Sequence, residues 1–180
     1  SITVTDTNFH HLAVSKSGST VVFYVDGVAY AVATYNPGFS FSTGAAIGAR
    51  GDNSDNSFLG TIDEVAVYNR ALSASEVQAI YLAGAAGKCV PPPPACTPPA
   101  SGLVSWWRGE GNGGDSAGGN NGALVGGATY TSGEVGQAMS FDGINSYVEV
   151  PDSPSLRLTN TLTIEFWVKR KQLDRPYGEV

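Results

Sequence analysis

A proline-rich stretch sets the first limit on how this chain can fold. Residues 85–101 read "AAGKCVPPPPACTPPAS". Consecutive prolines favour an extended, semi-rigid conformation, and the stretch has too few apolar side chains to form a core. We therefore expect a linker over residues 85–101 that divides the chain into residues 1–84 and residues 102–180.

Strand patterns lie on both sides of this linker. The apolar-rich runs "STVVFYV" and "VAYAVAT" flank Asp26-Gly27, a pair typical of a two-residue type I′ hairpin turn. The segment "TLTIEFWVK", residues 161–169, alternates cleanly between two faces. One face is expected to carry Leu162, Ile164, Phe166 and Val168, and the other Thr163, Glu165, Trp167 and Lys169.

One helix is predicted among about ten short strands. Ser73 and Glu76 form an S-x-x-E capping box, which predicts a helix of about two turns ending near Leu82. Its apolar side, with Val77, Ile80 and Tyr81, should pack on a sheet. Many short strands with a single helix indicate an all-β, two-sheet sandwich.

Charge and hydrophobicity argue against two classes of partner, nucleic acids and the membrane interior. Charged residues make up 14% of the chain, against roughly 25% in typical globular proteins, and the net charge is −6. No basic stripe is present to meet phosphates, which argues against a nucleic-acid partner. No apolar run approaches the ~18 residues of a membrane span.

Three long segments resemble laminin G-like (LamG) jelly-roll domains of the concanavalin A-like lectin/glucanase superfamily. They are "FHHLAVSKSGSTVVFYVDGV", "IGARGDNSDNSFLGTIDEVAVYNRALSASEVQAIY" and the run that begins "GLVSWWRGEGNGGDSAGGNNGAL". Residues 1–84 resemble the second part of such a domain, and residues 102–180 resemble the first part of another. The chain is therefore interpreted as the junction between two tandem copies.

The resemblance implies an antiparallel jelly roll. Because the first and last strands of this fold lie close together, we expect the two parts to dock as one circularly permuted, composite sandwich. Some of the middle strands of a complete domain would be missing from it.

Catalysis is not expected. Sandwich glucanases need carboxylates at alternate positions of one strand, yet the same-face neighbours of Glu165 are Thr163 and Trp167. Asp63 and Glu64 are adjacent and should point to opposite faces. We therefore predict that the chain is not an enzyme.

Calcium is a candidate cofactor. Asp63 is expected to point inward beside Val65, where a carboxylate needs compensation, and Asp115 lies in a glycine-rich turn rich in carbonyl groups. The resemblance implies a calcium site near such loops, with Asp52 and Asp55 as further candidates. Alternatively, these side chains form Asx-turns or accept backbone hydrogen bonds.

Outward aromatic side chains are candidate ligand-binding residues. Trp167, Tyr24 and Trp107 could stack on the apolar faces of sugar rings, unless loops or a neighbouring domain cover them. His10 and His11 are adjacent and should face opposite sides, which favours packed structural roles over a shared metal. Aromatic residues alone do not define a sugar site.

The two cysteines, Cys89 and Cys96, lie inside the proline-rich stretch. Their spacing does not match a CxxC redox or zinc motif. A small disulfide loop in an oxidising compartment is favoured over two free thiols, although four prolines oppose closure of the ring.

The resemblance implies a non-catalytic recognition module of a secreted or cell-surface multidomain protein. Its partners would be a glycan or an extracellular protein, together with neighbouring LamG-like repeats of the parent chain, and its binding could depend on calcium. The alternatives are a structural spacer or adhesin repeat without a ligand of its own, and a glycoside hydrolase remnant.

Overall fold

The computed structural model describes residues 4–35, 41–49, 57–89 and 96–172. The strands are β1 (Phe9–Ser17), β2 (Thr20–Val25), β3 (Val28–Ala31), β4 (Ala45–Ile47), β5 (Leu59–Tyr68), β6 (Leu103–Trp107), β7 (Ala123–Val125), β8 (Thr129–Ser132), β9 (Gln137–Asp142), β10 (Tyr147–Val150) and β11 (Thr161–Arg170). The helices are α1 (Ala74–Ala83) and the short 3₁₀ turns η1 (Gly84–Ala86) and η2 (Pro154–Leu156). None of the described helices is long and apolar enough to cross a membrane.

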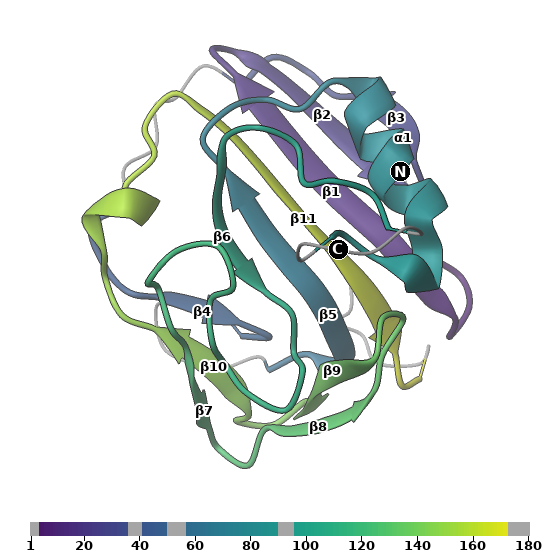
Figure 1. Cartoon of the computed structure of the whole chain (residues 1–180), viewed down its shortest axis with the longest axis vertical. Helices are drawn as coiled ribbons and strands as arrows, with labels where there is room; N and C mark the ends of the chain where they lie inside the picture. The colour runs from purple at the N-terminus through teal and green to yellow at the C-terminus, as the bar shows by residue number, and fades with distance from the viewer. Residues whose placement is uncertain (1–3, 36–40, 50–56, 90–95, 173–180) are drawn as a thin grey trace.

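The strands form two antiparallel sheets (Figure 1). The large sheet has the order β3-β2-β1-β11-β5-β9-β8, with β6 beside the second half of β5. The small sheet has the order β4-β10-β7. The predicted all-β, two-sheet sandwich with one short α-helix is confirmed for the described residues.

Both sheets combine strands from the two sides of the proline-rich stretch. β11 pairs with β1 along one edge and with β5 along the other. β5 also pairs with β9 and β6, and β10 pairs with β4. The two parts of the chain therefore share one composite sandwich.

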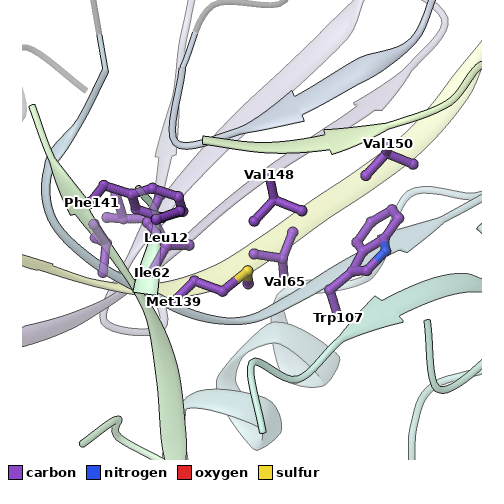
Figure 2. Packing of buried hydrophobic residues seen from close by; sticks show 10 residues of the cluster. Leu12, Ile62, Val65, Trp107, Met139, Phe141, Val148 and Val150 are labelled. Atoms are coloured by element: carbon purple, nitrogen blue, oxygen red, sulfur yellow. The ribbon is translucent and has the colours of Figure 1, made fainter. Parts of the chain in front are cut away.

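The core lies between the two sheets (Figure 2). Val148 and Val150 of β10 face buried residues of the large sheet. These are Leu12, Ile62, Val65, Trp107, Met139, Phe141 and Val168. The packing of the two sheets against each other removes these side chains from water.

The small sheet covers only part of the inner face of the large sheet. Phe23 pairs with Tyr30 and with Val14, which lies two residues from the core residue Leu12 and so on the same face. Phe23 and Tyr30 are nevertheless 42% and 40% exposed. This leaves an aromatic surface on the inner face beside β3.

Helix α1 covers the opposite, outer face of the large sheet (Figure 1). The predicted capping box is confirmed, because Ser73 N donates to Glu76 Oε2 at 2.9 Å and Glu76 N donates to Ser73 Oγ at 3.3 Å. Val77 and Ile80 pack in a second apolar cluster. Its other members are Ala13, Tyr24, Ala66, Tyr68, Leu72 and Trp106.

The hairpin turn between β2 and β3 is also confirmed. Asp26 and Gly27 have φ angles of 50° and 74°, the left-handed values that a type I′ turn requires. The Asp26 carboxylate accepts the backbone N–H of His11 at 2.9 Å, which fixes the turn against β1.

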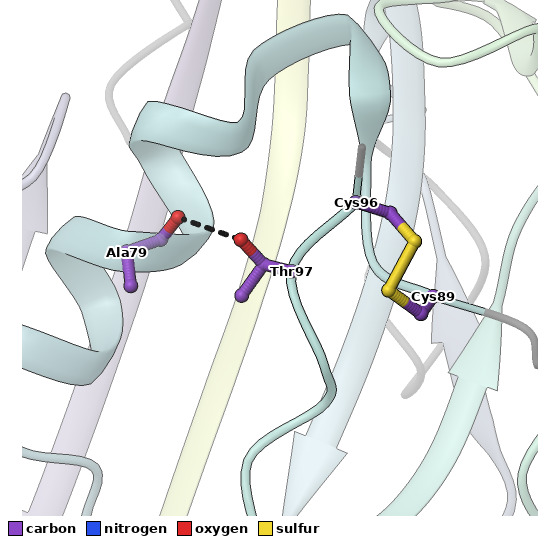
Figure 3. Close-up of a disulfide and its surroundings, with 4 residues drawn as sticks. All are labelled: Ala79, Cys89, Cys96 and Thr97. Carbon is purple, nitrogen blue, oxygen red and sulfur yellow. Dashed lines mark hydrogen bonds between the residues drawn. A yellow bond between two sulfur atoms is a disulfide. The ribbon is translucent and has the colours of Figure 1, made fainter. Parts of the chain in front are cut away.

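The described ends of the proline-rich stretch pack against the rest of the molecule. Cys89 and Cys96 form a disulfide with a Cα–Cα distance of 5.1 Å (Figure 3). Thr97 Oγ1 donates to Ala79 O of α1 at 3.4 Å, and Lys88 is only 6% exposed. These described ends therefore continue the cover that α1 begins, whereas the composition predicts a semi-rigid linker.

Candidate functional site

A pocket of about 360 Å³ opens on the outer face, where α1 ends above the large sheet. Its walls include Phe9 at the start of β1, Trp167 on β11 and Tyr81 on α1. Asp26 from the β2–β3 turn and Glu134 from the β8–β9 connection add two carboxylates. Leu82 and Gly84, at the end of α1, complete the lining.

Two of the three aromatic rings of the pocket are held by direct contacts. The ring centroids of Tyr81 and Trp167 are 5.8 Å apart, and the Trp167 ring also meets His11 edge-on at 5.2 Å. Tyr81 packs against Gly27, where an added Cβ would lie 3.0 Å from the Tyr81 ring. The hairpin turn thus holds the Tyr81 ring of α1 in its place in the pocket wall.

A hydrogen-bonded histidine orders the carboxylate of Asp26. His10 Nδ1 lies 2.8 Å from Asp26 Oδ2, and His10 Nε2 lies 3.1 Å from Asp6 Oδ1. Burial opposes the charged form of His10, but the hydrogen bonds to Asp26 and Asp6 outweigh it and raise the pKa of His10. Asp26 is therefore already engaged before any ligand arrives.

The structure places the three predicted ligand-binding aromatics in different environments. Trp167 is 5% exposed and lines the pocket. The expectation that Tyr24 and Trp107 offer exposed ring surfaces is wrong, since they are 5% and 3% exposed and do not line the pocket. Tyr24 lies in the cluster beneath α1, and Trp107 lies between the sheets, where its indole N–H donates to Asn120 O at 2.7 Å.

A β-bulge in β5 changes where its carboxylates lie. Asp63 pairs with Trp167, and Ala66 pairs with Glu165, with a register shift between the two pairs. Directly opposed residues share a face, as do Glu165 and Trp167, which are two apart. Asp63 and Ala66 therefore share the outer face although they are three residues apart. Glu64, with a φ of 58°, takes up the extra position.

The expected inward direction of Asp63 is therefore wrong. Val65 lies in the core between the sheets, whereas Asp63 lies opposite Trp167 on the outer face. The Asp63 carboxylate is fully buried there, and Oδ2 accepts the N–H of Val135 at 2.9 Å. Burial raises its pKa to about 7, although the Val135 N–H opposes the shift.

The bulge also assembles a buried carboxylate pair. Lys88 Nζ lies 3.2 Å from Glu64 Oε2 and 3.0 Å from Glu165 Oε1. The indole N–H of Trp106 donates to Glu64 Oε2 at 2.9 Å, and His11 Nε2 lies 3.0 Å from Glu165 Oε2. The carboxylates come from neighbouring strands, which a search for alternate positions along one strand could not detect.

Lys88 balances the charges of this pair. Burial would disfavour its ammonium form, but Glu165 and Glu64 outweigh that effect and raise the pKa of Lys88. Burial likewise disfavours the charged form of Glu165, yet Lys88 and His11 lower its pKa. For Glu64, burial dominates and raises the pKa.

Asp115 organises a loop through its carboxylate. Oδ1 accepts the backbone N–H groups of Trp106, Ala117 and Gly118 at 2.8, 3.0 and 3.0 Å. Oδ2 accepts the N–H of Asn120 at 3.1 Å. Burial opposes ionisation, but these donors lower the pKa of Asp115. This is the Asx-type role that stood as the alternative to a metal.

The structure does not join the predicted calcium residues into one site. Asp63 and Asp115 lie on different elements with separate hydrogen-bond partners, and Asp52 and Asp55 lie outside the described residues. Within the described ranges, no group of three or more His, Cys, Asp or Glu side chains is placed to hold a metal ion. Calcium stays a prediction.

Two residues of these sites could not be recognised from local sequence patterns. Glu134 joins the pocket only through the β8–β9 connection, and Lys88 reaches the carboxylate pair only because the proline-rich stretch folds back. Lys88 is the single basic residue between residues 85 and 101, which is the one sequence clue to a buried ion pair there.

Comparison with known families links the first part of this fold to a superfamily. Residues 1–78 match the Laminin_G_3 family model, the concanavalin A-like lectin/glucanases superfamily. The matched concanavalin A-like region includes β1 to β5 and the first turn of α1. Two of the seven residues that line the pocket, Phe9 and Asp26, lie inside the match. No curated protein and no solved structure matched the chain.

Proposed function

We propose that this chain is a non-catalytic recognition module that binds a glycan or protein ligand in the pocket at the end of α1. The pocket is the observation that carries the proposal. Phe9, Tyr81 and Trp167 supply apolar ring surfaces, and Asp26 and Glu134 supply hydrogen-bond acceptors. Sugars present both apolar C–H faces and hydroxyl groups, which is the chemistry that such a lining complements.

The setting that we propose is a secreted or cell-surface multidomain protein. The concanavalin A-like match over residues 1–78 and the Cys89–Cys96 disulfide support it, because disulfides persist in oxidising compartments. We further propose that residues 1–84 and 102–180 come from two neighbouring LamG-like repeats. The complementary order of their motifs supports this origin.

The carboxylate pair supports a non-catalytic role. Glycosidases hold a sugar between two carboxyl groups, whereas Lys88 lies between Glu64 and Glu165. All three side chains are at most 1% exposed, so the pair offers no room for a substrate.

A structural spacer is the second candidate function. The burial of Tyr24 and Trp107 favours it, because a spacer needs no aromatic binding face. The exposure of Phe23 and Tyr30 favours recognition and adds a second surface on which a ligand could stack. Recognition therefore has two candidate surfaces, on opposite faces of the large sheet.

A glycan array with three proteins tests the proposal. The wild type should bind a limited set of glycans, Tyr81→Ala should lose that binding, and Tyr30→Ala should keep it. Both variants remove one partly exposed tyrosine, so they are matched in size and chemistry. If only Tyr30→Ala lost glycan binding, the ligand would be assigned to the inner face. Binding to no glycan and to no extracellular protein by the wild type would favour the spacer.

A further inference from the structure

The C-terminal end of α1 and the Glu134 carboxylate form an uncompensated negative region in the pocket. A Cβ placed on Gly84, the C-cap of α1, would lie 3.7 Å from Glu134 Oε1. The C-terminal end of a helix carries partial negative charge, which a nearby carboxylate reinforces. The last turn of α1 contains no basic residue.

Two basic side chains contact residues that line the pocket, but neither forms an ion pair with Glu134. Lys169 Nζ lies 5.4 Å from the Phe9 ring centroid, and His10 lies between Asp6 and Asp26. Glu134 has no ion-pair or hydrogen-bond partner among the residues that the structure describes. A cation that binds beside this carboxylate and the helix C-terminus would interact favourably with both.

The other groups in the pocket suit a ligand with a cationic end and an apolar face. The rings of Tyr81 and Trp167 lie 5.8 Å apart, and their faces attract cations and C–H groups. Trp167 is 5% exposed, and its indole N–H has no hydrogen-bond partner within the described part of the chain. That N–H can donate to a ligand hydroxyl.

We infer that the pocket binds a hexosamine unit with a free ammonium group. The ammonium would pair with Glu134 at the end of α1, and the sugar ring would lie against Tyr81 and Trp167. This inference rests on the proposed recognition function and names its ligand class. A pocket of about 360 Å³ lies within the range of small-ligand sites and is large enough for one sugar unit.

Matched sugars test the charge requirement. The binding of D-glucosamine, N-acetyl-D-glucosamine and D-glucose would be measured by NMR titration of the full chain. Glucosamine should bind about tenfold more tightly than either neutral sugar, because a charge-assisted hydrogen bond contributes that much. Glu134→Gln should reduce glucosamine binding to the level of glucose and leave glucose binding unchanged. The control Glu149→Gln, an exposed carboxylate on β10, should leave all three affinities unchanged.

The outcomes separate this inference from the proposed function. Equal affinities for the three sugars, or an unchanged glucosamine affinity in Glu134→Gln, would overturn the inference while leaving a sugar-binding pocket. Tighter binding of Nα-acetyl-lysine methylamide than of glucosamine would also overturn it, in favour of a lysine from a protein partner. No chemical-shift change at the pocket with any of these probes would overturn both the inference and the placement of the site.

Discussion

Lys88 Nζ lies 3.0 Å from Glu165 Oε1, and both side chains are at most 1% exposed. This ion pair joins the proline-rich stretch to the central strand β11. Because Glu64 shares the same ammonium, the loss of Lys88 would leave two carboxylates buried without a cation.

Replacing Lys88 with Met should lower the free energy of unfolding by about 3–5 kcal/mol, the cost of breaking a buried ion pair. Urea unfolding measures this change. Lys171→Met is the control, since Lys171 is exposed and its loss should change stability by less than about 0.5 kcal/mol. Adding Glu64→Gln and Glu165→Gln to Lys88→Met should recover part of the loss, and no recovery would refute the charge argument.

Asp63→Asn should stabilise the protein increasingly as the pH rises. The pKa of Asp63 is raised from 3.8 to about 7, so the folded state binds more protons than the unfolded state between these values. The contribution of Asp63 to stability therefore falls as the pH increases through this window, and Asn removes that dependence. The stability gain should grow by roughly 2–4 kcal/mol between pH values of about 4 and about 8. Parallel stability curves for the two proteins would contradict the buried position of Asp63.

Removing the disulfide should destabilise the sandwich by about 2–3 kcal/mol, because the bond closes a short loop. Unfolding of Cys89→Ser/Cys96→Ser, compared with the oxidised wild type, measures the effect. When the two cysteine substitutions are combined with Lys88→Met, the loss of stability should be smaller than the sum of the two separate losses, since both changes act through the same stretch. Strict additivity would show that the disulfide does not help to position Lys88.

Asp115→Ala should lower the melting temperature by the same amount in calcium and in EDTA. Its carboxylate accepts four backbone N–H groups, and their loss does not depend on a metal. Melting curves in both buffers measure this. A loss of stability that occurs only with calcium present would instead identify Asp115 as a calcium ligand.

Local patterns predicted those elements that local interactions determine. The turn at Asp26-Gly27 follows from backbone preferences, and the helix start follows from two side chains, Ser73 and Glu76, that cap it directly. The alternation in β11 predicted a two-faced strand, but both faces are buried, because α1 and the described ends of the proline-rich stretch cover the second one.

The candidate site depends on contacts that periodicity does not encode. A single bulged residue, Glu64, reverses the expected direction of Asp63 and brings a carboxylate to Glu165 on the next strand. Strict alternation cannot show such a shift, because the bulge is fixed by the pairing of β5 with β11. The pocket similarly needs side chains from five separate parts of the chain.

The place of β11 in the large sheet has a consequence for synthesis. Among the described strands, β1 and β5 do not pair with each other, and each pairs with β11, which follows all the others in the sequence (Figure 1). A nascent chain that has not yet extended past Thr161 therefore holds two unjoined groups of strands with unpaired edges. Closure of the sheet must wait for the ribosome to release β11, and chaperones would have the longest access to the protein in that interval.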